Sequence, residues 1–102
     1  MITDKQFEDA FTAAGGWFIL SQYEVIHNWT GTKAELIDRL FTEGFDNKRD
    51  GTSTRVSSVI RIIEGKRGKE ALVKIRDSSR INKMHPEAEK MANDLIQKYY
   101  NN

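Results

Sequence analysis

The chain has 102 residues, of which 38% are hydrophobic and 30% are charged, and its formal net charge at pH 7 is +1. This length and apolar content suffice for one hydrophobic core, so we expect a single helical domain over residues 1–102. Cysteine is absent and histidine occurs only twice, which excludes disulfides and thiolate metal sites and leaves little for a zinc or imidazole centre. We therefore predict no cofactor, no metal site and no catalytic residues.

Hydropathy gives no sign of a membrane protein. No apolar run approaches the ~20 residues that span a bilayer. The first residues, MITDKQFEDAF, lack the basic start and apolar stretch of a secretory signal. We expect a cytoplasmic protein that makes no membrane contact.

Two segments carry the clearest helix signals. TDKQFEDAFTAAGG begins with a capping box formed by Thr3 and Gln6, and a glycine pair ends it. TKAELIDRLFTEGF repeats this pattern with Thr32 and Glu35, and Gly44 stands where a helix ends in the left-handed conformation. Both segments are predicted to be helices with one apolar face.

Between them, GWFILSQYEVIHNW is apolar on every side when it is drawn as a helix. This pattern is typical of a central, buried helix, but the start, WFIL, also fits a short strand. The segment holds both tryptophans, and aromatic side chains of this kind either fill a core or anchor a protein interface.

Residues 45–54 contain many turn-forming side chains and are predicted to be a surface loop. A helix over residues 53–64 would then be capped by Ser53 or Thr52 and end at Gly65. Its apolar stripe would consist of Val56, Val59, Ile60 and Ile63. The opposite side would carry Thr54, Ser57, Ser58 and Arg61.

The rest of the chain predicts two further helices. One covers 69–81, with Ala71, Leu72, Ile75 and Ser79 facing inward. The other follows Pro86 and would bury Ala88, Met91, Ala92, Leu95, Ile96 and Tyr99. The predicted fold is an all-α, compact, single-domain bundle of five or six short helices.

Charge is distributed unevenly along the chain. Residues 51–84 carry nine basic and three acidic side chains (+6), whereas residues 1–30 sum to −3, 31–50 to −1 and 85–102 to −1. Such asymmetry favours a surface that faces a polyanion. On a helix over 69–81 that continues to residue 83, Lys69, Arg76, Arg80 and Lys83 would share a stripe about 60° wide.

We therefore predict a nucleic-acid-binding protein, which uses a basic edge within residues 55–83. The candidate contacts are Arg55, Arg61, Lys66, Arg67, Lys69, Arg76, Arg80 and Lys83. Short hydroxyl side chains beside Arg61 would let a helix approach a nucleic-acid groove closely. The order of the helices over 32–64 is compatible with a helix-turn-helix arrangement, although the connection is longer than the usual three or four residues.

Two alternatives remain open. The first is a protein-interaction or inhibitor module, or a homodimer, which would use the aromatic segment 17–29 or the acidic segment 1–30 and no nucleic acid. The second is a magnesium-dependent nuclease. In that case VIRIIEGK would be a strand carrying Glu64 and Lys66, with Asp46 or Asp50 as the first carboxylate, as in restriction-endonuclease-like enzymes, which this pattern resembles.

Overall fold

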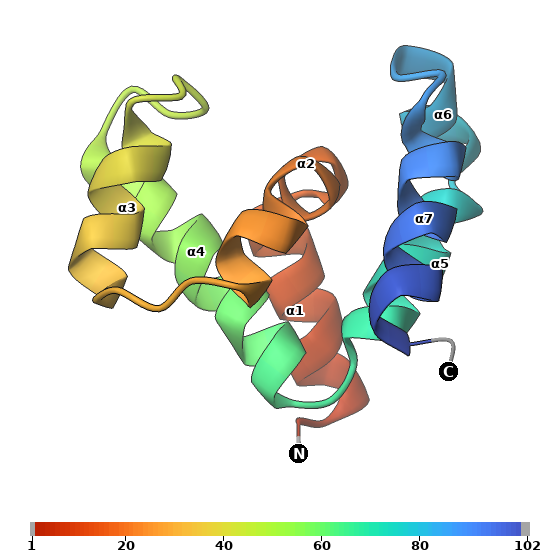
Figure 1. The fold of residues 1–102 in the computed structure, drawn as a ribbon, viewed down its shortest axis with the longest axis horizontal. Coiled ribbons are helices and arrows are strands. Elements are labelled where there is room, and N and C mark those ends of the chain that lie inside the picture. Colours follow the sequence, from red (N-terminus) through yellow and green to blue (C-terminus); the bar gives the residue numbers. More distant parts are fainter. Residues whose placement is uncertain (1, 101–102) are drawn as a thin grey trace.

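A computed structural model describes residues 2–100, and in this range the chain forms seven helices and no strand (Figure 1). The helices are α1 (Asp4–Ala14), α2 (Gly16–His27), α3 (Lys33–Phe41), α4 (Arg49–Glu64), α5 (Gly68–Arg76), α6 (Ser79–Met84) and α7 (Ala88–Tyr100). The all-α bundle is as predicted. There is one helix more than predicted, because the chain bends where the sequence predicted a continuous helix over 69–81.

Both predicted capping boxes form. The Gln6 amide donates to Thr3 Oγ1 at 3.1 Å while the Thr3 amide donates to Gln6 Oε1 at 2.9 Å. Thr32 and Glu35 exchange the same pair of bonds at the start of α3. These bonds satisfy amides that the first turn of a helix leaves without partners.

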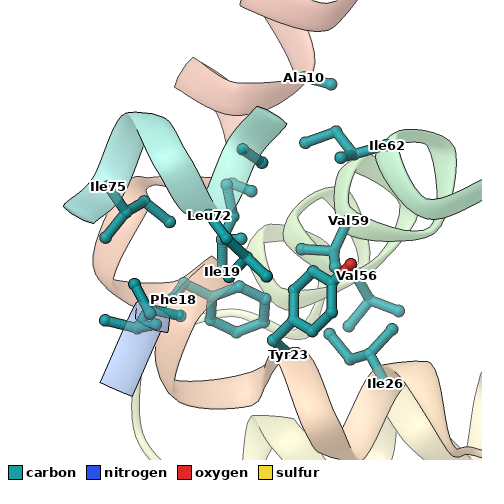
Figure 2. Packing of buried hydrophobic residues seen from close by; sticks show 14 of the residues in the cluster. Ala10, Phe18, Ile19, Tyr23, Ile26, Val56, Val59, Ile62, Leu72 and Ile75 are labelled. Atoms are coloured by element: carbon teal, nitrogen blue, oxygen red, sulfur yellow. The ribbon is translucent and has the colours of Figure 1, made fainter. Parts of the chain in front are cut away.

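α2 is the central helix of the bundle, and it packs against α1, α4, α5 and α7. Phe18, Ile19 and Tyr23 are each no more than 2% exposed and point toward side chains of α4 and α5 (Figure 2). The helical interpretation of this segment is therefore confirmed as far as His27, and the strand interpretation of WFIL is wrong. A helix that is apolar on every side is stable in a water-soluble fold only when neighbouring elements bury all of its faces.

The other helices pack mainly in pairs around α2. α1 lies along α4, and α5 lies along α7 (Figure 1). In α4 the fully buried apolar side chains are Val56, Val59 and Ile62. Ile60 and Ile63, which the sequence placed in the core stripe, are only half-buried. The inward face of α4 is thus rotated slightly from the predicted one.

α4 begins earlier than the sequence predicted, at Arg49, so the connection from α3 covers only residues 42–48. The predicted caps at Thr52 and Ser53 are wrong, since both residues lie inside the helix. Thr52 is fully buried, and its hydroxyl donates to the carboxylate of Asp46 at 3.1 Å. The Thr52–Asp46 bond holds the preceding loop against the second turn of α4.

A break at Asp77 and Ser78 separates α5 from α6. The Ser78 hydroxyl accepts the amide of Ile81 at 3.2 Å and so caps a new helix. The side-chain amide of Asn82 donates to three backbone carbonyls around the bend, those of Ile75, Arg76 and Ser78. Ser79, which was predicted to face inward, is exposed because α6 takes a new direction.

α7 closes the bundle over α2 and α5. It begins at Ala88, after a turn that contains Pro86, and it buries Ala88, Ala92 and Ile96 as predicted. Met91, Leu95 and Tyr99, which were also predicted to be buried, are half-buried. The Tyr99 hydroxyl donates to Glu24 of α2 at 2.7 Å. The C-terminal helix is thus fixed to α2 by polar as well as apolar contacts.

Candidate functional site

Arg55 ties together three parts of the fold. Its Nε lies 3.1 Å from both carboxylate oxygens of Asp46, and another guanidinium nitrogen donates to the carbonyl of Ala14 at the end of α1. The guanidinium carbon lies 5.7 Å from the ring centre of Phe18. Because these groups already use the guanidinium, only part of it is available to an external phosphate.

Arg67 has a similar structural role in the turn before α5. It forms ion pairs with Asp4 of α1 at 3.0 Å and with Glu70 of α5, and its side chain is only 16% exposed. Its guanidinium carbon lies 4.3 Å from the ring centre of Phe7. The guanidinium of Arg67, which was predicted to contact nucleic acid, is therefore already engaged by two carboxylates and an aromatic ring.

Arg76 pairs with its neighbour Asp77 at 3.0 Å and also reaches Asn93 of α7. Its bond to Asp77 raises the pKa of the guanidinium above its ordinary value. The side chain is 34% exposed, and Asp77 and Asn93 already use part of its guanidinium.

The other five predicted contacts are exposed and form no ion pair within residues 2–100. They are Arg61, Lys66, Lys69, Arg80 and Lys83. Arg61, Lys66 and Lys69 surround the turn from α4 to α5. Arg80 and Lys83 belong to α6, which lies at the far end of the α5–α7 pair (Figure 1). The predicted single stripe of Lys69, Arg76, Arg80 and Lys83 is wrong, because the bend at Asp77–Ser78 divides it.

The outward side of α4 keeps the predicted composition. Ser53, Thr54, Ser57, Ser58 and Arg61 line a shallow hollow of about 270 Å³. The Thr54 hydroxyl donates to the carbonyl of Asp50, and the Ser58 hydroxyl donates to the carbonyl of Thr54. Hydroxyls that bond back to the helix stay close to it. The side chains on this part of α4 therefore do not extend far from the helix, and another molecule can approach the backbone.

A second hollow continues this surface toward α3. Lys33, the first residue of α3, lines it together with Ser57, Ile60, Arg61 and Glu64. Lys33 is exposed and has no ion-pair partner among the described residues. The sequence prediction missed it because Lys33 lies outside the basic segment 51–84, and no local pattern brings it next to Arg61. Gly65 also lines this second hollow, and Lys66 is the next residue along the chain. The two hollows together with Lys66 are called the α4 face below.

The nuclease interpretation fails on local structure. Glu64 ends a helix instead of a strand, and Asp46 lies near the opposite end of the same helix, bound to Thr52 and Arg55. Among residues 2–100, histidine and acidic side chains nowhere gather in a group of three that could hold a metal ion. Glu64, Lys66 and the two candidate aspartates therefore do not form the predicted site.

The aromatic residues of segment 17–29 divide between the core and the surface. Phe18 and Tyr23 are buried, whereas Trp17 and Trp29 are half-buried and each lines a hollow.

No helix in the described part of the chain is both long and apolar enough to cross a membrane. No protein-family model matches the sequence, and comparison with curated proteins and with solved structures finds no match.

Proposed function

We propose that the protein binds the backbone of nucleic acid through the α4 face. One observation carries this proposal: short hydroxyl side chains on α4 lie beside three exposed cations, Lys33, Arg61 and Lys66. None of the three forms an ion pair within residues 2–100. Lysine and arginine that neutralise phosphates release counterions, and this release supplies most of the affinity for nucleic acid of any sequence.

The dimensions of the α4 face support duplex binding. An α-helix with its side chains is about 10–12 Å across, which is close to the width of a major groove at ~12 Å. Serine and threonine hydroxyls bind phosphate oxygens, and an arginine between them reaches either a phosphate or a base edge. In the hollow lined by serine and threonine, Arg61 is the one long side chain, so we expect weak sequence preference.

Fluorescence anisotropy with labelled duplex and single-stranded oligonucleotides tests the proposal. We expect the duplex to bind at about 50 mM salt and its affinity to fall steeply by about 200 mM. Replacing Arg61 and Lys66 together by glutamine should lower the affinity and reduce the slope of log affinity against log salt by about 2, since each lost phosphate contact removes ~0.9.

The matched control replaces Lys5 and Lys90 by glutamine, which changes the net charge by the same amount. Both lysines are more than 80% exposed and lie on other helices, α1 and α7. The control should bind almost as the wild type does. An equal loss in both variants would show that only total charge matters, and absence of binding at low salt would refute the proposed function altogether.

A further inference from the structure

A separate hollow of about 300 Å³ lies between the start of α2, the loop after α3 and the helix α6. It shares no residue with the α4 face. Its walls are mainly apolar and come from Trp17, Phe45, Ile81 and Met84. We call it the α2–α6 groove.

One wall of the groove is a pair of stacked rings. The rings of Trp17 and His85 lie parallel, with their centres 3.7 Å apart. The His85 amide donates to the carbonyl of Ile81 at 2.8 Å, which anchors this residue at the end of α6. Stacking and the backbone bond hold the Trp17 ring half-buried in a fixed position, so it presents a preformed apolar surface.

Met84 forms the rim of the groove, and its side chain is 71% exposed. No other large apolar side chain in the described part of the chain is classed as exposed. α6 buries none of its own residues, so the protein gains little stability from placing a methionine there. Exposed methionines beside aromatic rings are typical of surfaces that adapt to peptide partners.

The groove is lined by positively charged side chains, which favour apolar partners that also carry negative charge. Arg55 and Arg80 line it, and no carboxylate among residues 2–100 does. Arg80 is exposed and forms no ion pair with the other residues that the structure describes, and Arg55 is 30% exposed although Asp46 binds its Nε. A ligand carboxylate would therefore find an unpaired guanidinium beside an apolar surface, whereas a basic ligand would be repelled.

We infer that the α2–α6 groove binds a short acidic segment of a partner protein. The segment would place one large apolar side chain between Trp17 and Met84 and a neighbouring carboxylate on Arg80. The volume, about 300 Å³, accommodates one or two side chains and not a folded surface. This interaction is independent of nucleic-acid binding, because the two surfaces have no residue in common.

The test begins with a displayed library of random peptides of about twelve residues, selected on the wild-type protein. We expect the selected peptides to contain aspartate or glutamate next to phenylalanine, tryptophan, leucine or methionine. Their affinities are then measured by anisotropy on the wild type and on variants. Met84→Glu and Arg80→Glu should each weaken binding by roughly tenfold or more, and both residues are exposed, so the fold should tolerate the changes.

Lys83→Glu is the matched control, because Lys83 lies on the same helix, is exposed and does not line the groove. It reverses the same charge as Arg80→Glu and should leave peptide affinity within about twofold of the wild type. Equal losses in Lys83→Glu and Arg80→Glu would overturn the inference, as would selected peptides without acidic residues. So would a single-stranded oligonucleotide that displaces the peptides, since base stacking on Trp17 would then explain the groove.

Discussion

Gly68, the first residue of α5, is buried where α5 approaches α2 and α7. A Cβ atom at this position would lie well under 3.0 Å from the hydroxyl oxygens of both Tyr23 and Tyr100. The two hydroxyls are hydrogen-bonded to each other. Burial and the hydrogen bond to Tyr100 raise the pKa of Tyr23 far above its ordinary value, so the Tyr23 hydroxyl is neutral at pH 7. We predict that Gly68→Ala destabilises the protein.

The magnitude follows from three opposing effects. Alanine is favoured over glycine in a helix by up to about 1 kcal/mol. An extra methyl in a packed site costs about 1–3 kcal/mol, and separating the two tyrosine hydroxyls loses about 1 kcal/mol more. The net free energy of unfolding should therefore fall by roughly 1–3 kcal/mol.

Urea unfolding followed by far-UV circular dichroism measures this change. The informative comparison introduces Gly68→Ala into a background that carries Tyr23→Phe and Tyr100→Phe, where the two nearest oxygens are absent. There the penalty should shrink by about 1 kcal/mol or more, because neighbouring residues couple by this amount. The reasoning is refuted if Gly68→Ala is neutral in the wild type, or if its penalty is the same in both backgrounds.

Two further predictions concern local bonds. Thr32→Ala should lower the free energy of unfolding by about 1 kcal/mol through loss of the α3 cap, whereas Thr12→Ala, on the exposed side of α1, should not. Hydrogen bonds from Lys98 and Tyr99 lower the pKa of Glu24 below its ordinary 4.5. Because this pKa is lower in the folded protein than in the unfolded chain, the Glu24 carboxylate stabilises the fold above pH 4.5. The stabilisation is lost as the pH falls through the pKa of Glu24 in the folded protein. Stability below pH 4.5 should therefore depend less on pH in Glu24→Gln, as measured by urea unfolding at several pH values.

The helices themselves are largely encoded by short-range signals. Thr3 and Thr32 cap their helices through residues three positions ahead, and this spacing can be read directly from the chain. The all-round apolar character of residues 17–29 likewise predicts the central position of α2. The bend at Asp77–Ser78 was not predicted, although Ser78 caps α6 through Ile81, also three positions ahead. Asn82 stabilises the bend through carbonyls of the preceding turn, and these contacts exist only once the chain has bent.

The candidate site was less accessible to sequence reasoning. The basic segment was visible as a charge excess, but periodicity cannot show which guanidinium groups are already paired. Arg55 binds a loop carboxylate and the end of α1, and Arg67 binds α1 across most of the chain length. Arg61 and Lys33 come together in one hollow although they belong to different helices. Each of these relations depends on how helices pack.

The sequence by itself determined that this protein is an all-α bundle, where its best-capped helices begin, and that α2 fills the centre. These features depend on the period of the hydrophobic residues and on hydrogen bonds between residues three or four apart. Both are properties of short segments and do not require distant parts of the chain to meet. Only the tertiary structure decided which of the described cations remain without an ion pair and that α6 takes a different direction from α5. It also decided that Trp17, Arg80 and Met84 line one groove. Such contacts join distant segments, so they follow from packing and not from local pattern.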